Sequence, residues 1–343
     1  MKIAAAAISV SGHSRRRRPA GVSFTGTGEW YRREADKVRR GGVDNGHTAA
    51  TFLDYPRCWI IEFHKGGHPM AADEVAPPGV DISTPSIARV YDFMVGGKDN
   101  FEVDRLVARR ALEIAPDGLE AGRACRALLR RAVRYLAAEA GIRQFLDIGS
   151  GLPTETNVHQ VAHQVDPAAR VVYVDNDPSV LVHGHALLAG DGTTALIEAD
   201  IRSPETILEH PVVREKLDFT QPIGLLLFSV LHHLNDGEDP GGVAATLRDA
   251  LPAGSHLAIT HFWDPAEEHP ETSSRVVEAE RVFNESLGTG RWRRRAEIEA
   301  FVGDFELIEP GLVPLAEWRP DGEAVAEQKE TYYTMLAGVA RKR

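Results

Sequence analysis

The feature that most constrains the fold is a short apolar run that carries an acid and is followed by two glycines. The run is Phe145–Ile148, with Asp147 inside it, and Gly149 and Gly151 come directly after. This order is typical of a buried parallel strand that turns into the first helix of a nucleotide-binding α/β fold. Because glycine has no Cβ, backbone N–H groups in such a turn can come close to a ligand. Many loops contain glycines spaced in this way, so the prediction depends on the residues further along the chain.

Two further strand-like runs also end at an acid. Val171–Val174 is β-branched and aromatic and ends at Asp175, which lies 28 residues after Asp147, and Ala195–Ala199 ends at Asp200. The spacing leaves room for one helix between each pair of runs. In doubly wound folds an acid at the tip of the second strand accepts the ribose hydroxyls of an adenosine ligand. The three runs together predict an α/β, Rossmann-like doubly wound sheet with an adenosine site.

Charge near the glycine loop distinguishes two classes of cofactor. A dinucleotide places its pyrophosphate over the first helix N-terminus, which favours a third glycine three residues after the second. Pro153 and Thr154 follow here instead, and Asp147 would repel a pyrophosphate. S-adenosylmethionine has no phosphate, and its ammonium and sulfonium groups suit an acid beside the loop. The residues therefore favour S-adenosylmethionine, with a nicotinamide-dependent oxidoreductase as the alternative.

These segments resemble the motifs of a known family. Asp147–Gly151 is similar to motif I of class I methyltransferases, and Tyr173–Pro178 resembles their ribose motif. Pro85–Phe101 resembles the opening signature of one subfamily, the S-adenosylmethionine-dependent methyltransferases catalogued as domain of unknown function 574, or methyltransferase family 19. Further segments similar to this subfamily are Gly151–Thr154, Asn157–His159 and Glu309–Val313. The resemblance extends from about Asp81 to Arg343.

The resemblance implies a mostly parallel sheet of seven strands, with the last strand inserted antiparallel. After the first three runs, we expect the remaining strands at 223–230, 257–260, 305–308 and 332–336. The resemblance also implies methyl transfer from S-adenosylmethionine, and we expect a small-molecule acceptor that the sequence does not identify. A non-catalytic S-adenosylmethionine-binding protein is a second alternative, because no residue is unambiguously catalytic.

The chain is expected to have three parts. Residues 1–69 hold 12 Lys and Arg against 6 Asp and Glu, and are interpreted as a disordered tail or as a mis-assigned start ahead of Met70. Residues 70–140 are predicted to form an N-terminal helical cap, and 141–343 the Rossmann-like methyltransferase domain. Beyond residue 69 there are 27 basic and 44 acidic residues, which argues against nucleic acid or an anionic membrane as the main partner.

Cysteine content and hydropathy indicate which kinds of protein this chain can be. Cys58 and Cys125 are the only cysteines in the sequence, so a disulfide framework is excluded and a cytoplasmic location is expected. No apolar run of about 18 residues is present, so no membrane span is expected. The sequence contains no cluster of Cys and His residues that would indicate a metal site. The chain is therefore expected to be a cytoplasmic enzyme.

The candidate cofactor site is predicted from the strand ends and from the opening signature. Ligands of open α/β sheets bind beyond the carboxyl ends of the strands, near the point where the strand order reverses. The residues expected to bind the cofactor are Tyr91, Gly97, Asn100, Asp147, Gly149, Ser150, Gly151, Asp175, Asn176, Asp200, Ile201 and Ser229. Asp175 is expected at the ribose. The resemblance implies that Asp200 accepts from the adenine amino group, with a helix cap as its alternative role.

The segment Tyr91–Asn100 interrupts a helical pattern with Gly96 and Gly97. Glycine costs ~1 kcal/mol within a helix, so the pair predicts a turn. One interpretation is a simple turn between two helices. The other is a lid over the methionine end of the cofactor, lined by Tyr91 and Asn100.

A histidine pair follows the strand predicted at 223–230, and His233 is the candidate catalytic residue. Methyl transfer from a sulfonium is an in-line displacement, so alignment supplies most of the acceleration. A base matters where the acceptor is a hydroxyl or an ammonium, and a histidine could then serve. The alternative is a helix-start histidine that packs beside the pocket. His261 is a second, weaker candidate for the base.

Acceptor specificity is expected in the N-terminal helices and in Phe262–Trp292. Trp263, Phe283 and Trp292 are expected either to line an apolar acceptor pocket or to pack a helix onto the sheet. The run Arg291–Arg295 is interpreted as the solvated start of a helix.

Overall fold

A computed structural model describes residues 8–9, 49–54, 57–62, 76–154, 156–188, 192–322 and 329–343. The chain divides into two units, Met1–Val80 and Asp81–Arg343. In the first unit, β1 (Ile8–Ser9), β2 (Ala49–Asp54) and β3 (Arg57–Glu62) form an antiparallel sheet in that order. Most residues of the predicted N-terminal tail lie outside the described residues, so that expectation stays a prediction.

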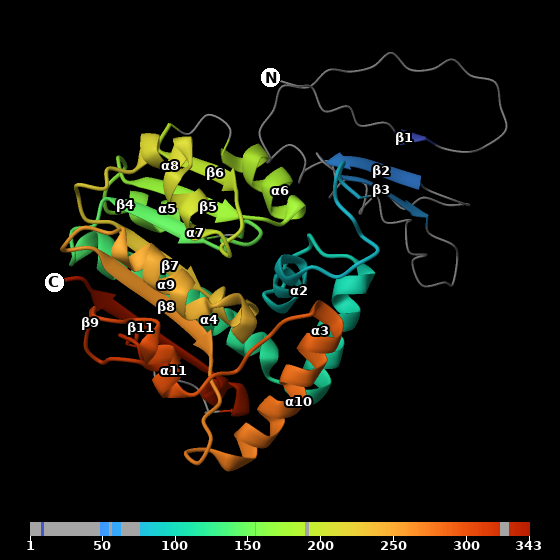
Figure 1. Ribbon diagram of the computed structural model, residues 1–343. Coiled ribbons are helices and arrows are strands. Elements are labelled where there is room, and N and C mark those ends of the chain that lie inside the picture. The colour runs from blue at the N-terminus through green and yellow to red at the C-terminus, as the bar shows by residue number, and fades with distance from the viewer. Residues whose placement is uncertain are drawn as a thin grey trace, which may run out of the picture. The chain divides into compact units, whose positions relative to one another are not determined.

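The second unit is built on a mostly parallel sheet of eight strands (Figure 1). The strands are β4 (Gln144–Ile148), β5 (Arg170–Asp175), β6 (Thr194–Glu198), β7 (Gly224–Phe228), β8 (His256–Phe262), β9 (Glu306–Leu307), β10 (Val313–Pro314) and β11 (Met335–Arg341). Their order is β10-β11-β8-β7-β4-β5-β6, and β9 also pairs with β11. From β4 the chain builds outward to β5 and β6, then returns to place β7 on the other side of β4. This reversal puts the switch point of the sheet beside β4.

Alternating residues of the parallel strands pack on opposite faces of the sheet. Leu146 and Ile148 belong to one core cluster, which includes side chains from α7 (Pro204–Glu209), α8 (Pro211–Lys216), α9 (Pro240–Asp249) and α11 (Arg295–Ala300). Phe145 belongs to the second cluster, with side chains from α4 (Gly118–Ala138) and α5 (Val158–His163). Residues of a strand alternate in direction, so a strand buried on both faces is apolar throughout. This explains the nearly continuous apolar run that the sequence shows at each of these strands.

The helices follow the α/β alternation expected from the sequence. They are α2 (Ile87–Met94), α3 (Glu102–Ile114), α4 (Gly118–Ala138), α5 (Val158–His163), α6 (Pro178–Leu188), α7 (Pro204–Glu209), α8 (Pro211–Lys216), α9 (Pro240–Asp249), α10 (Pro270–Leu287) and α11 (Arg295–Ala300). In Figure 1, α10 lies beside α3, and α2 packs against both α3 and α4. α2, α3 and α10 lie at the end of the sheet where the parallel strands finish (Figure 1), whereas the later residues of α4 pack in the core on one face of the sheet.

The last strands differ from the expectation of seven. Within the segment predicted as one strand at 305–308, only β9 pairs with another strand. A turn separates β9 from β10, and in this turn Gly311 N donates to Ile308 O. Pro310 lies in this turn and has no N–H for a sheet ladder. The strand predicted at 332–336 begins only at Met335, because 330–334 form a 3₁₀ turn. The last strand, β11, is antiparallel to β8, as the resemblance implies.

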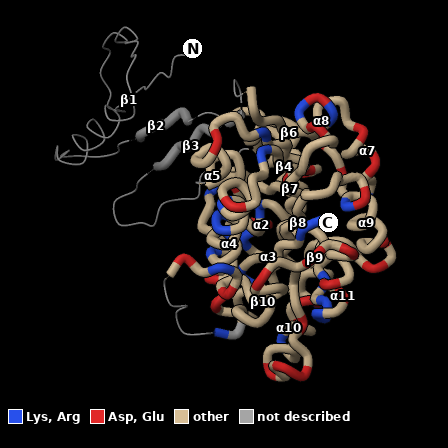
Figure 2. The backbone as a smooth tube through the Cα atoms, turned by 90° about the vertical axis from the view of Figure 1, so that its left-hand side faces the viewer, with Lys and Arg blue, Asp and Glu red and all other residues tan. Residues whose placement is uncertain are grey.

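Basic residues gather along α4 in Figure 2. Two of these arginines form hydrogen bonds to backbone carbonyl groups of other segments, so they do not belong to a free basic surface. Arg131 donates to the carbonyl oxygens of Trp318 and Leu315, at 3.0 and 2.7 Å. Arg126 donates to Thr156 O at 2.7 Å. No helix among the described residues has the length and apolar character needed to cross a bilayer.

Truncation of Leu136 tests how α4 is fixed to the sheet. Leu136 is fully buried between α4 and the sheet, whereas Leu106 on α3 is 53% exposed. We expect Leu136→Ala to lower the free energy of unfolding by about 2–5 kcal/mol, because a cavity remains in the core. Leu106→Ala is the control and should change it by less than about 1 kcal/mol. Urea titration of the two variants measures the difference, and equal losses would contradict this packing of α4.

Candidate cofactor and acceptor site

A cavity of about 570 Å³ lies beyond the carboxyl ends of β4, β5 and β7. The predicted residues that line it are Tyr91, Asp147, Gly149, Ser150, Gly151, Asp175, Asn176, Ile201, Ser229 and His233. Gly97, Asn100 and Asp200 are not among the lining residues. Much of the remaining wall comes from α2, α3, α4 and α10, so this part of the cavity lies between the sheet and these helices.

The glycine loop after β4 has the backbone conformation that the sequence predicts. Gly149 and Gly151 have φ of 72° and 67°, in the left-handed region that favours glycine. The N–H groups of Gly149 and Ser150 both donate to Val174 O on the neighbouring strand. A Cβ on Gly149 would lie 2.6 Å from a methyl carbon of Val230. Gly149 is therefore required for close packing as well as for the turn.

Asp147 is a buried acid at the inner end of the cavity. Its exposed fraction is 5%, and burial raises its pKa to about 7. The guanidinium of Arg126 opposes this rise in pKa, and the carboxylate of Asp175 adds to it. Arg126 is not among the predicted site residues, because nothing in the sequence distinguishes it from the other arginines of α4. An acid and a guanidinium at one end of a cavity can hold the two charges of an amino acid.

Asp175 joins the loops after β4 and β5. One carboxylate oxygen accepts from Gly151 N at 2.8 Å, and the other accepts from Asp177 N at 3.0 Å. Burial raises the pKa of Asp175, while the two backbone donors act against that rise. A carboxylate has about four lone-pair sites, so lone pairs remain for a ligand on the cavity side. This geometry fits the ribose role predicted for Asp175.

Asp200 is half-buried and bonds to its own neighbours. It accepts from Asn176 Nδ2 at 3.1 Å and from the backbone N–H of Arg202 at 2.9 Å. The helix α7 begins at Pro204 with Ser203 as its N-cap, so the side chain of Asp200 is not the cap of that helix. The neighbouring Ile201 and Arg202 line the cavity. The predicted adenine contact of Asp200 stays a prediction.

The turn at 95–101 holds its polar residues in a local network. Asn100 is buried and donates through Nδ2 to Asp92 at 2.8 Å and to Gly97 O at 3.2 Å. A Cβ on Gly97 would collide with the carboxylate of Asp92, which explains the glycine. The structure therefore places Asn100 and Gly97 in a helix–helix turn. Tyr91 alone of the three faces the cavity, where burial raises the pKa of its phenol.

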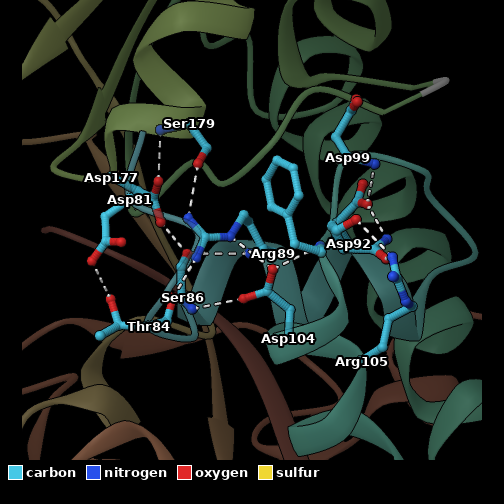
Figure 3. Close-up of polar contacts among 12 residues, drawn as sticks. Asp81, Thr84, Ser86, Arg89, Asp92, Asp99, Asp104, Arg105, Asp177 and Ser179 are labelled. Atoms are coloured by element: carbon cyan, nitrogen blue, oxygen red, sulfur yellow. Dashed lines mark hydrogen bonds and ion pairs between the residues drawn. The ribbon is translucent and has the colours of Figure 1, made fainter. Parts of the chain in front are cut away.

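A buried polar network joins α2 to the start of α6 (Figure 3). Ser86, the N-cap of α2, donates to Asp177, which follows Asp175 by two residues. Arg89 donates to Ser179 Oγ at 3.1 Å and forms a fully buried ion pair with Asp104 at 2.8 Å. Breaking a buried pair leaves an uncompensated charge, which is strongly destabilising. We call the bonds of Ser86 to Asp177 and of Arg89 to Ser179 the latch on α2. The latch was not predicted from the sequence, and it fixes α2 to the loop after β5.

The histidine pair after β7 has two different environments. His232 is 1% exposed, stacks on Phe262 at 3.6 Å between centroids, and accepts from Phe262 N through Nδ1. His233 lines the cavity, and its Nδ1 is buried without a hydrogen-bond partner among the described residues. Burial, with a smaller contribution from Arg202, lowers the pKa of His233 to about 3. The imidazole of His233 is therefore neutral at physiological pH.

An aromatic wall closes the same side of the cavity. Phe262 stacks on Trp292 at 4.1 Å, and Phe283 meets the edges of both rings. These three residues line the cavity. Trp263 does not line it, because its side chain is 2% exposed and lies in the core on one face of the sheet. The prediction of an aromatic acceptor wall therefore fits Phe283 and Trp292 but not Trp263.

His261 and Arg293 serve the fold of this wall. His261 is fully buried, with Nδ1 at 2.6 Å from Phe262 O and Nε2 at 3.1 Å from Arg293. Both ring nitrogens are engaged, so His261 has no free nitrogen for a substrate. Arg293 is 5% exposed and donates to the carbonyl oxygens of Leu231 and Leu234. The interpretation of its segment as a solvated helix start is therefore wrong for Arg293.

A doubly wound sheet, a glycine loop at the switch point and an acid at the tip of the second strand define an adenosine-binding α/β protein. A family model described as S-adenosyl methyltransferase matches residues 73–343. The chain belongs to this family, and its cofactor is S-adenosylmethionine.

Two solved structures are similar to the chain over most of its length. One is a putative methyltransferase from Thermobifida fusca YX, 48% identical, covering 78% of this chain and 98% of that one, with a TM-score of 0.73. The other is a DUF574 family protein from Streptomyces avermitilis MA-4680, 38% identical, covering 77% and 99%, with a TM-score of 0.72. A search of curated proteins found no significant match. The nicotinamide alternative has no support in these comparisons.

Two glycine variants test the loop after β4. Gly149→Ala adds both backbone strain and a clash with Val230, whereas Gly151→Ala adds strain alone, since nothing lies within 4 Å of its Cβ. We expect Gly149→Ala to lower Tm more than Gly151→Ala and to weaken S-adenosylhomocysteine binding at least about tenfold. Calorimetric titration and thermal unfolding measure both effects. Equal behaviour of the two variants would contradict the close approach of Val230.

The raised pKa of Asp147 predicts a pH-dependent affinity. If the carboxylate holds the ligand ammonium, protonation must weaken binding, so the Kd of S-adenosylhomocysteine should rise by up to about tenfold between about pH 8 and about pH 6. Asp147→Asn should remove most of this dependence.

Because ionisation of a buried acid destabilises the folded state, Asp147→Asn should also raise the Tm of the free protein. This gain in Tm should develop as the pH rises from 3.8, the ordinary pKa of an aspartate, to about 7, the raised pKa of Asp147.

Proposed function

We propose that the protein transfers the methyl group of S-adenosylmethionine to a small-molecule acceptor that binds in the cap half of the cavity. The observation that carries this proposal is the pairing of one buried acid with one guanidinium beside the glycine loop. Asp147 suits an ammonium and Arg126 a carboxylate, which are the two charges of a methionine group. Tyr91 from α2 closes over the same end. The residues present therefore fit this cofactor.

When bound, S-adenosylmethionine supplies a methyl group on a sulfonium, which a nucleophile displaces in line. The protein's contribution is mainly alignment, because Asp175 fixes the two loops that hold the adenosine and the latch on α2 fixes the cap. Ser229, whose φ of 55° is unusual for a residue with a side chain, faces the cavity from the end of β7. Its N–H donates to Thr260 Oγ1 at 2.8 Å, which fixes this strained conformation.

His233 is the residue placed to receive an acceptor proton. Its neutral imidazole lies at the end of β7 and lines the cavity. The burial that lowers its pKa to about 3 also makes it a weak base. Its role is therefore to accept a hydrogen bond from the acceptor and orient the nucleophile, with proton transfer following bond formation.

Titration of the purified protein with S-adenosylmethionine, S-adenosylhomocysteine and NAD tests this proposal. We expect the first two to bind and NAD not to bind. Asp175→Ala should weaken binding at least about 100-fold, because it removes both the ribose acceptor and the bridge between the loops. Asp218→Ala is the control, since Asp218 is an acid outside the cavity lining. Binding of NAD alone, or unchanged affinity in Asp175→Ala, would overturn the proposal.

A further inference from the structure

The cap half of the cavity is apolar and is built from three helices. Its walls include Met94 of α2, Ala111 and Ile114 of α3, and Val276, Ala279 and Leu287 of α10. Met94 and Leu287 each pack against the small cluster that α2 and α3 form at Val90, Val107 and Ala108. These helices therefore form a mainly apolar surface facing the ends of the strands, with Thr272 and Arg275 of α10 as its polar members.

Apart from Arg275 on α10, the charged residues that line the cavity lie in its other half. The charged lining residues are Arg126, Asp147, Asp175, Asp177, Arg202 and Arg275. Of the first five, Arg126 lies on α4, Asp147 and Asp175 lie near the ends of β4 and β5, and Asp177 and Arg202 lie in the loops after β5 and β6. Arg275 is an exposed residue of α10. An ion held against the walls of α3 and α10 would have no buried partner of opposite charge among these residues, and burying an unpaired charge is costly.

The polar groups at the junction of the two halves are neutral. His233 and Ser229 reach the cavity from the end of β7, and Thr260 from β8. The aromatic wall of Phe262, Phe283 and Trp292 adjoins them, with the rings fixed by their mutual stacking. Fixed aromatic rings favour flat apolar ligands, which bury a large area against them at a low entropic cost.

We propose that the acceptor is an uncharged, ring-containing apolar molecule whose single hydroxyl points at His233, an inference that rests on the proposed methyl transfer. The hydroxyl oxygen forms the new bond to the methyl carbon, and the carbon–sulfur bond breaks with its electron pair left on sulfur. The hydroxyl proton passes to the His233 imidazole and then to water. The products are a methyl ether and S-adenosylhomocysteine.

Three naphthalene probes of matched size test the acceptor class. The uncharged probe is 2-naphthol, the anion is 2-naphthoate, and the cation is 2-(aminomethyl)naphthalene. Each is titrated into protein saturated with S-adenosylhomocysteine. We expect 2-naphthol to bind at least about tenfold more tightly than either ion, since only the ions would bury a charge against walls whose one charged residue in the described part of the chain, Arg275, is exposed. Equal or tighter binding of either ion, or no binding of 2-naphthol, would overturn the inference.

Two adjacent positions on α10 show where the probe binds. Ala279 lines the cavity, whereas Val277 is 68% exposed. Ala279→Trp should fill the chamber and weaken 2-naphthol binding at least about tenfold, with S-adenosylhomocysteine affinity within about twofold of the parent. Val277→Trp should change neither affinity. Undiminished 2-naphthol binding to folded Ala279→Trp would exclude this chamber as the binding site.

Ala111→Phe fills the chamber from α3 and replaces Ala279→Trp if that variant does not fold. The two ligands separate the two proposals. If S-adenosylhomocysteine fails to bind, the proposed function fails, and titration of 2-naphthol into the free protein still tests the apolar chamber. If S-adenosylhomocysteine binds and 2-naphthol does not, only the acceptor class is wrong.

Discussion

The buried carboxylate of Asp175 is the interaction on which the cofactor site depends. It accepts from Gly151 on one loop and from Asp177 on the next, at 2.8 and 3.0 Å. A buried carboxylate without such donors would be costly, so the folded state strongly favours the geometry that supplies them. The two loops leave neighbouring parallel strands at the switch point, and this acid fixes their spacing. In the proposed function, the same group that organises the loops also binds the ribose.

The helical cap depends on the same loop through the latch on α2. Ser86 donates to Asp177 and Arg89 to Ser179, so the cap is bonded to the segment that carries Asp175. The ion pair of Arg89 with Asp104 is buried, with side chains 4% and 0% exposed. This pair joins α2 to α3, so it fixes the two helices to each other, while the bonds to Asp177 and Ser179 fix α2 over the cavity. In the proposed mechanism, this position also aligns acceptor and cofactor, because the acceptor walls belong to α2, α3 and α10.

The parts of the site that could be predicted from sequence are those with a local signal. The glycines at 149 and 151 and the acid at 175 directly follow or end apolar runs, and a strand end fixes where such residues lie. Gly97 and Asn100 also belong to a distinctive segment, but the structure places them in a turn with Asp92 as partner. A local pattern shows that a turn is needed there. It does not show whether a polar side chain bonds to a ligand or to the turn itself.

The sequence by itself determined the doubly wound sheet, the glycine loop, the acid at the end of the second strand and the helical nature of the cap, because hydrophobic period and turn residues act over a few positions. Tertiary structure decided which of many arginines matter. Arg126 turns into the cavity, while Arg293 is buried against the carbonyl groups of Leu231 and Leu234. It also decided that His233 and not His261 faces the cavity. These outcomes depend on partners far apart in the chain, which only packing brings together.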